Sequence, residues 1–227
     1  MKIIRSESTL HDASSHYKGL FILAAVFTTL GVVAFAVDMP LARYCLAGKL
    51  PGDIKRLFSM SEVFGHGLGV LMILVTVFVL DPDRRRSVAR LATAAFGSGL
   101  AANCVKMMVA RWRPHSFDLE SGGVWDTFCG LMLLGGESSK MQAFPSAHTA
   151  TAVGLAVGLS WLYPRGRWLF ATFAVLVACQ RIQSGAHFLS DTLFGAALGC
   201  AVATVCIEYV KWFDRFEGKL SEPPADC

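Results

Sequence analysis

Long apolar segments constrain the fold of this chain more than any other feature of its sequence. A helix that crosses a bilayer needs about 20 mostly apolar residues. Six segments approach this length: 19–37, 63–80, 88–108, 146–163, 168–180 and 188–210. Because 54% of the residues are hydrophobic and only 17% are charged, the composition does not fit an ordinary soluble domain. The sequence therefore predicts an all-α fold, an integral membrane bundle of six transmembrane helices.

The six segments form one predicted domain, 1–227, because the sequence contains no repeat, low-complexity tract or long linker. Residues 1–18 and 211–227 are predicted to be cytoplasmic tails. Segment 19–37 also resembles a cleavable signal peptide, with Ala34-Phe35-Ala36 as its cleavage site. Its length and the acidic residues of the preceding tail favour an uncleaved first helix instead.

The distribution of lysine and arginine predicts the topology. If the N-terminus is cytoplasmic, 12 of these residues lie on the inner side and 5 on the outer side. The inner set is Lys2, Arg5, Lys18, Arg84, Arg85, Arg86, Arg90, Arg165, Arg167, Lys211, Arg215 and Lys219. The outer set is Arg43, Lys49, Lys55, Arg56 and Lys140, with Lys106, Arg111, Arg113 and Arg181 set aside as candidates for a site. The positive-inside rule selects this orientation, with both termini cytoplasmic, and short loops favour a bacterial inner membrane.

The remaining charges and the cysteines add little about function. The basic cluster 84–86 is interpreted as a determinant of topology, so no nucleic-acid partner is expected. The seven cysteines show no zinc-binding spacing. Cys45 and Cys129 fall in the two longer outer segments and can form a disulfide if that side is oxidising.

Three short polar patterns lie at the ends of the apolar segments. They are Lys106 with Arg113-Pro114, then Pro145-Ser146-Ala147-His148, and finally Arg181, His187 and Asp191. The predicted topology places all three patterns on the outer face, although their cations were not counted in deriving it. Three cations, two histidines and one carboxylate suit phosphate binding and acid–base chemistry. The sequence thus predicts one site on the outer face, facing the periplasm.

The first pattern has two interpretations. Lys106 and Arg113 are seven residues apart, so they are expected to share a helix face, with Pro114 ending that helix. Taken alone, both cations are equally typical of side chains that reach from a helix end to lipid headgroups. Arg181 favours a site, because it extends an apolar segment in which a charge is unfavourable.

The second and third patterns are also consistent with an anion site. Pro145 suits a first helical position, and the free N–H groups of the helical turn that follows it favour an anion. His187 and Asp191 are four residues apart and are expected to be neighbours, after a turn that Gly185 makes possible. An interfacial His148 and a purely structural hydrogen bond between His187 and Asp191 are the alternatives.

The three patterns together resemble those of the type 2 phosphatidic acid phosphatase superfamily, which also contains vanadium haloperoxidases and glucose-6-phosphatase. The family pattern is K-x6-R-P, then P-S-G-H, then S-R-x5-H-x3-D, and the resemblance covers about residues 88–200. Two positions depart from it, because Ala147 replaces a glycine and Gln180 replaces the serine before Arg181. Ala147 keeps its N–H group, so anion binding is expected to persist, whereas Gln180 leaves one peripheral hydrogen bond in doubt.

The resemblance implies a role for each motif residue. His187 is the nucleophile that forms a phosphohistidine, Asp191 orients and stabilises its ring, and His148 protonates the leaving oxygen. The phosphate is bound by Lys106, Arg113, Arg181, the Ser146 hydroxyl and the N–H groups near Ala147. Because three cations can neutralise a phosphate, no metal and no other cofactor is expected.

The predicted function is hydrolysis of a phosphate monoester or diphosphate on a lipid at the outer face of the membrane. A phosphotransferase that passes the phosphoryl group to a lipid hydroxyl would use the same residues. A vanadate-dependent haloperoxidase is disfavoured because those relatives are soluble, and a transporter or lipid-binding protein is disfavoured because the motif side chains are complete. The candidate substrates are undecaprenyl diphosphate, phosphatidylglycerophosphate, phosphatidate and lipid A phosphates.

Two outer segments are expected to flank the site. Segment 115–144 is predicted to form part of its entrance, and segment 39–62 is predicted to lie on the membrane surface. His66 and His115 are left out of the catalytic set. For His66, helix packing beside two glycines is the favoured interpretation.

Overall fold

The computed structural model describes residues 4–131 and 139–220, with the side chains of residues 18–131 and 139–208. Its longer elements are α1 (Ile4–Ala34), α2 (Asp38–Leu46), α3 (Gly52–Ser61), α4 (Gly67–Leu80), α5 (Arg85–Lys106), β1 (Val109–Arg111), β2 (Phe128–Leu131), α6 (Ala147–Leu162), α7 (Arg167–Gln183) and α8 (Leu189–Leu220). The predicted tails are helical over 4–18 and 211–220, and their ends lie outside the described residues, as do residues 132–138 of the predicted entrance segment.

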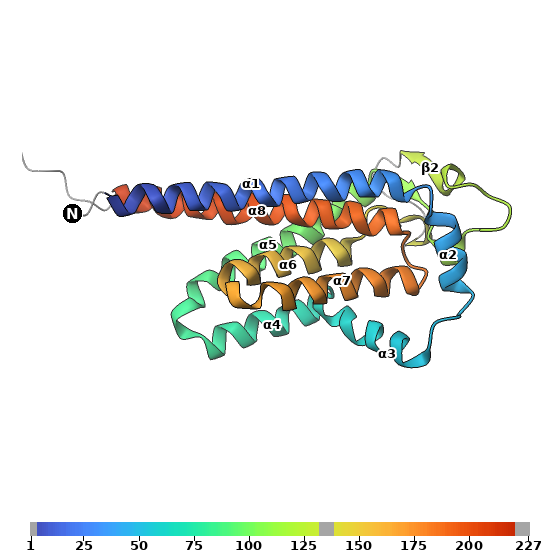
Figure 1. Cartoon of the computed structure of the whole chain (residues 1–227), viewed down its shortest axis with the longest axis horizontal. Coiled ribbons are helices and arrows are strands. Elements are labelled where there is room, and N and C mark those ends of the chain that lie inside the picture. The colour runs from blue at the N-terminus through green and yellow to red at the C-terminus, as the bar shows by residue number, and fades with distance from the viewer. Residues whose placement is uncertain (1–3, 132–138, 221–227) are drawn as a thin grey trace, which may run out of the picture.

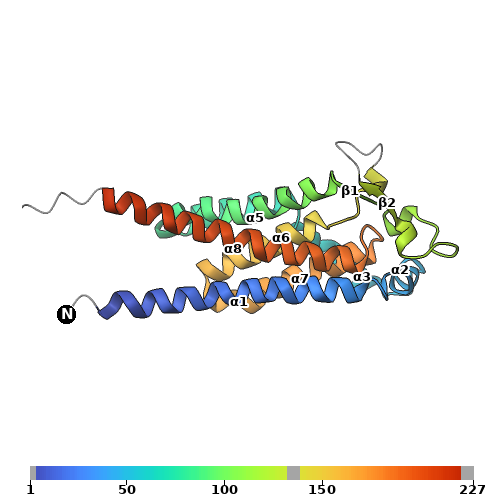
Figure 2. The same cartoon turned by 90° about the horizontal axis from the view of Figure 1, so that it is seen from above.

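The helices form an elongated bundle. The two longest helices, α1 and α8, pack against each other toward one end of the bundle and diverge toward the N-terminus (Figure 2). Helices α5, α6 and α8 pack against one another, while α7 packs on α6 and α4 packs on α5. Helices α2 and α3 and the β1–β2 hairpin gather at one end, opposite the N-terminus (Figure 1). This is called the hairpin end below.

Small residues allow the central helices to approach closely. A Cβ atom on Gly154 of α6 would lie 2.4 Å from the Ala94 carbonyl oxygen of α5. A Cβ atom on Gly199 of α8 would lie 2.7 Å from the Ala150 carbonyl oxygen of α6. Such contacts between backbones are typical of helices that associate in a membrane, where packing rather than burial from water holds them together.

The prediction of six transmembrane helices is only partly supported. Each predicted segment contains one of the six helices α1 and α4–α8. Among the described residues, however, only Pro82–Lys106 and Leu189–Glu208 are long and apolar enough to cross a membrane alone. Two bent pairs raise the number to four, namely Lys18–Ala34 with Asp38–Leu46 and Gly52–Phe64 with Gly67–Leu80. The helices α4, α6 and α7 have 14, 16 and 17 residues, fewer than a span usually requires.

The prediction of an all-α fold is wrong in one detail, and the surface segment has more structure than expected. Strands β1 and β2 form a small antiparallel sheet at the hairpin end. Segment 39–62 contains two helices, of which α3 has no buried residue and exposes Leu57 and Met60. Cys45 is buried and Cys129 is exposed, and both are free thiols, so the suggested disulfide is not formed.

Candidate active site

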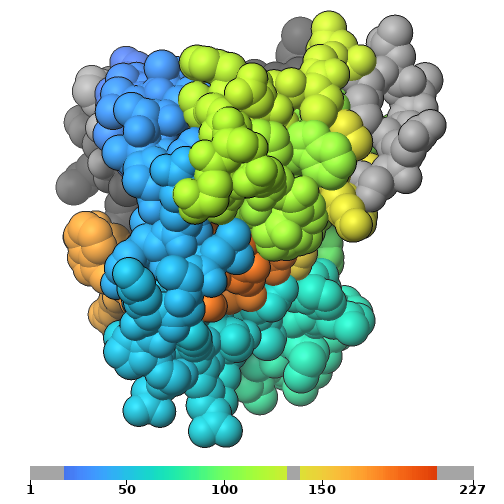
Figure 3. Space-filling model, turned by 90° about the vertical axis from the view of Figure 1, so that its right-hand side faces the viewer, coloured from blue at the N-terminus to red at the C-terminus, as the bar shows by residue number. Residues whose placement is uncertain are grey.

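Four helix ends meet at the hairpin end, and most of the predicted site residues lie on them or directly beside them. Lys106 is the last residue of α5, His148 is the second of α6, Arg181 is close to the end of α7, and Asp191 is the third of α8. Figure 3 shows this end of the molecule. A small orange area belongs to the region of α7 and the start of α8, and it is surrounded by the blue and cyan surfaces of α1–α3 and the green surface around β1 and β2. The site is therefore built from sequence-distant helix ends and surrounded by the outer segments.

The prediction that Lys106 and Arg113 share a helix face is wrong. Helix α5 ends at Lys106, and residues Val109–Arg111 form strand β1. The helix cannot continue because Arg111 is drawn into the interior, where its side chain is fully buried and bonded to three other elements. Arg113 follows the strand in extended conformation, and its N–H group donates to the Lys140 carbonyl oxygen at 2.8 Å.

Ser146 is the N-cap of α6, so Pro145 precedes the helix and does not occupy its first position as predicted. The Ser146 hydroxyl oxygen accepts hydrogen bonds from the N–H and the hydroxyl of Thr149, at 3.4 and 3.0 Å. Its own proton is therefore available to an anion. The backbone N–H of Ser146 donates to the Asp191 carbonyl oxygen at 3.0 Å, which joins the start of α6 to α8. The first N–H groups of α6, including that of Ala147, have no acceptor within the helix and favour a negative charge.

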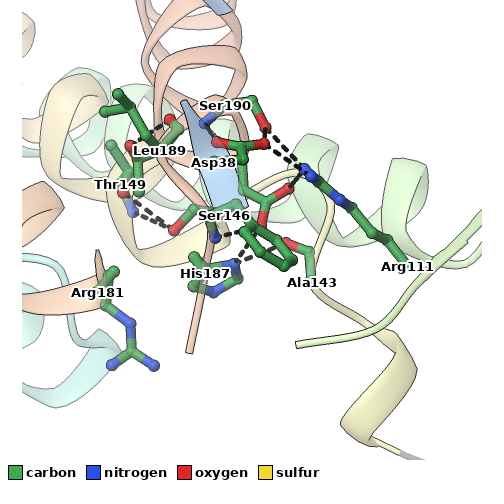
Figure 4. Close-up of polar contacts among 12 residues, drawn as sticks. Asp38, Arg111, Ala143, Ser146, Thr149, Arg181, His187, Leu189 and Ser190 are labelled. Carbon is green, nitrogen blue, oxygen red and sulfur yellow. Dashed lines mark hydrogen bonds and ion pairs between the residues drawn. The ribbon is translucent and has the colours of Figure 1, made fainter. Parts of the chain in front are cut away.

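His187 is buried and held as one tautomer. Its Nδ1 atom lies 2.6 Å from the Ala143 carbonyl oxygen, which can only accept, so Nδ1 carries the proton and the lone pair is on Nε2 (Figure 4). The Asp191 carboxylate lies 3.7 Å from Nδ1, within ion-pair distance but too far for a hydrogen bond. Burial lowers the pKa of His187 to about 4, against the opposing effect of Asp191, so the ring is neutral at pH 7. Gly185, with φ of +67°, makes the preceding turn.

Asp191 belongs to a buried charge network that the motifs did not reveal. The Arg111 guanidinium donates to Asp38 at 2.8 Å and to the Ser190 hydroxyl at 2.7 Å (Figure 4). It also donates to Asp191 at 2.5 Å and to the Thr127 hydroxyl at 3.1 Å. The side chains of Arg111, Asp38 and Asp191 are all 0% exposed. The network ties α2, β1 and α8 together behind His187. In the sequence, Asp38 is visible only as an acidic residue directly after the first apolar segment.

Two arginines present buried donors that have no protein partner. The Nε atoms of Arg113 and Arg181 are buried and make no hydrogen bond with any described residue. Unpaired buried donors are rare in folded proteins, and a catalytic role or a bound ion is among their explanations. Burial lowers the pKa of Arg113 from its usual value, although the group remains a cation, and the nearby Asp191 opposes this shift. An oxyanion is the ligand that such donors fit.

His148 lies beside a carboxylate that the sequence analysis did not single out. Glu62, in the short 3-10 turn Glu62–Phe64 before α4, pairs with Arg181 Nη1 at 2.5 Å and lies 3.7 Å from His148 Nε2. Gln180 donates to the same carboxylate at 3.0 Å.

The two histidines left out of the catalytic set also lie near the site. The ring of His66 is 5.9 Å from that of His148, so His66 borders the site rather than serving only in helix packing. The N–H group of His115 donates to the Gly185 carbonyl oxygen at 3.0 Å and supports the turn before His187. This arrangement can hold an oxyanion against cationic donors, with one neutral histidine buried beside it and a second histidine at its edge.

Comparisons with known proteins agree with this interpretation. The model of the PAP2 superfamily matches residues 87–215, which confirms the family resemblance of the three motifs. A lipid A 1-phosphatase of Rhizobium etli is 27% identical over 195 residues, covering 78% of this chain and 79% of the relative. A lipid A 1-phosphatase of Rhizobium johnstonii is 27% identical over 196 residues, covering 78% and 75%.

Two solved structures share the fold. The crystal structure of Aquifex aeolicus LpxE has a TM-score of 0.58 at 20% identity, covering 76% of this chain and 96% of that one. A transmembrane PAP2 type phosphatidylglycerolphosphate phosphatase from Bacillus subtilis has a TM-score of 0.51 at 17% identity, covering 90% and 98%.

Proposed function

This chain belongs to the PAP2 superfamily, and we propose that it removes a phosphate from a membrane lipid at the outer face through a phosphohistidine intermediate. It is a membrane lipid phosphatase, a hydrolase of phosphoric esters. The observation that carries the mechanism is the pairing of two features. Buried donors of Arg113 and Arg181, which have no partner among the described residues, lie at the same end of the bundle as a histidine whose Nε2 atom carries the lone pair.

The phosphate binds first. Lys106, Arg113 and Arg181 neutralise its charge, and the Ser146 hydroxyl and the N–H groups at the start of α6 donate hydrogen bonds to the remaining oxygens. Because these donors are fixed before the substrate arrives, they also stabilise the charge of the transition state. Three protein cations supply the neutralisation that a metal ion supplies in other phosphatases, so the reaction is expected to proceed without one.

His187 Nε2 then attacks phosphorus, and the bond from phosphorus to the lipid oxygen breaks. His148 takes up a proton when the phosphate anion binds beside it, and it gives this proton to the oxygen as it leaves, which contributes about 10²- to 10⁴-fold in rate. The phosphorylated ring becomes positive, and Asp191 at 3.7 Å stabilises it. Water then attacks phosphorus with His148 as base, which releases inorganic phosphate and restores a neutral His187.

The substrate is proposed from the relatives, which are lipid A 1-phosphatases. A lipid A phosphate is therefore the first candidate, ahead of phosphatidylglycerophosphate, phosphatidate and undecaprenyl diphosphate. Lysine and arginine are in excess on the side of the predicted membrane opposite the site, which supports an outer, periplasmic site in a bacterial inner membrane.

The test is inorganic phosphate release by detergent-purified protein with these four lipids, in EDTA, beside His187→Ala. Release from one lipid that the variant loses is expected, with the variant still folded but unfolding at a lower temperature, because alanine leaves a cavity at this buried position. Substantial turnover by the variant would refute the nucleophile assignment. No release from any lipid by the wild-type protein would favour a phosphotransferase that requires a lipid acceptor.

A further inference from the structure

Glu62 brings a negative charge to the edge of a site otherwise lined with cations. Its Oε1 atom pairs with Arg181 Nη1 at 2.5 Å, while the Arg181 Nε atom on the same guanidinium is buried without a partner among the described residues. Arg181 thus divides its donors between the carboxylate and the free space of the site. Glu62 does not replace the phosphate; it lies beside the place that the phosphate would take.

The position of Glu62 is fixed by its surroundings. Gln180 donates to its second oxygen at 3.0 Å and accepts from Arg181 at 3.2 Å, which locks the three side chains together. The turn that carries Glu62 packs tightly on the site helices. A Cβ atom on Gly65 would lie 2.7 Å from the His148 carbonyl oxygen and 2.8 Å from a Val177 methyl group. The carboxylate is therefore a built part of the site.

The carboxylate faces the leaving-group side of the reaction. His148 is the residue that protonates the departing oxygen, and its Nε2 atom lies 3.7 Å from Glu62 Oε1. This distance is too long for a hydrogen bond, so Nε2 stays available to the substrate. The atom attached to the departing oxygen must then lie near Glu62. A sugar or glycerol carbon there is neutral, whereas the second phosphate of a diphosphate is an anion.

We propose that Glu62 is a specificity-determining residue that restricts this enzyme to lipid phosphomonoesters by repelling the second phosphate of lipid diphosphates. The proposal rests on the function proposed above, with His148 on the leaving-group side. Of the four candidate lipids, it disfavours undecaprenyl diphosphate and retains the three whose phosphate is attached directly to a carbon atom.

The experiment compares the monophosphate and the diphosphate of one lipid alcohol, with wild-type protein, Glu62→Gln and Glu120→Gln. Glu120 is a matched control, because it is an acidic residue at the same end whose side chain is 85% exposed. Glutamine keeps the size of Glu62 and one of its two acceptor oxygens, and it removes the charge. Wild-type protein should prefer the monophosphate. Glu62→Gln should raise kcat/KM for the diphosphate roughly tenfold or more, since like charges at this position disfavour binding strongly.

The absolute value of kcat/KM for the diphosphate decides the test. If Glu62→Gln changes the ratio only by slowing the monophosphate, Glu62 supports His148 instead and the specificity proposal is overturned. An equal effect of Glu120→Gln would also overturn it, as a general charge effect. Binding of a phosphonate and a methylene diphosphonate of the same alcohol, followed by thermal shift, separates the two proposals. If Glu62→Gln binds the diphosphonate more tightly than the wild type does, but neither protein hydrolyses any lipid phosphate, the proposed phosphatase function is refuted while the repulsion by Glu62 is supported.

Discussion

Replacing Arg111 with methionine tests whether the buried charge network holds the catalytic end together. Methionine fills similar space but removes four hydrogen bonds and leaves the carboxylates of Asp38 and Asp191 in a site that is 0% exposed. Removing one partner of a buried ion pair costs about 3–5 kcal/mol. Asp38 keeps its bonds to Ser190 and Asp191 keeps its bond from the Phe188 N–H, so the lower value, about 3 kcal/mol, is expected.

That loss is large enough to measure in detergent. For a chain of this size, 1 kcal/mol corresponds to about 2–4 °C in unfolding temperature, so Arg111→Met should unfold roughly 6–12 °C below the wild type. kcat should fall by about a hundredfold, because a displacement of about 1 Å at a reacting group has that effect. Both values come from thermal scanning fluorimetry and phosphate release on the same preparation.

Arg43→Met is the matched control. Arg43 lies at the same end, but its side chain is 41% exposed, its ion pair with Glu120 is long, at 3.7 Å, and its hydrogen bonds go to one carbonyl oxygen, that of Leu119. The exposed pair contributes at most about 1 kcal/mol and the bonds to Leu119 about 1 kcal/mol, so the unfolding temperature should fall by less than in Arg111→Met, and kcat should stay close to the wild-type value. If Arg111→Met behaves like Arg43→Met in both assays, the network does not position Asp191 and the argument from burial fails.

Three further predictions concern the same end of the bundle. Burial lowers the pKa of His187 to about 4 from its usual 6.5, so the unfolded chain binds more protons than the folded one between these pH values. The free energy of unfolding should therefore fall by up to about 3 kcal/mol as the pH is lowered from 6.5 to 4. His187→Asn should lose this pH dependence of the unfolding temperature, and parallel pH curves for the two proteins would contradict the assignment. Ser146→Ala removes the N-cap of α6 and one donor to the phosphate, so it should lower the free energy of unfolding by about 1 kcal/mol. It should also weaken inhibition by vanadate, an oxyanion that resembles phosphate, and unchanged inhibition would exclude the hydroxyl as a ligand. Gly195→Ala places a Cβ atom 2.5 Å from the Ser146 carbonyl oxygen and should cost about 1–3 kcal/mol with loss of activity, whereas Gly19→Ala, with nothing within 4 Å, should be neutral in both assays.

The helices and the chemistry of the site could be predicted from the sequence because both depend on residues that are close together along the chain. Apolar segments specify helices through composition alone, and each predicted segment holds one of the six main helices. The motifs name the residue types that phosphate chemistry needs, and charge counting predicts which helix ends share a face. Lys106, His148, Arg181 and His187 are predicted in this way, and the family match confirms the family resemblance.

Only the tertiary structure decided how these ends are held and what borders them. Arg113 reaches the site from a strand and not from a helix, because the burial of Arg111 ends α5 early. Arg111 and Asp38 are 73 residues apart, and Arg181 and Glu62 are 119 apart. Two buried charged residues pair only if packing brings their elements together, and the periodicity of the sequence does not show which distant elements pack together. The sequence therefore predicts which groups react, whereas the packing of distant elements determines their orientation and the carboxylate beside them.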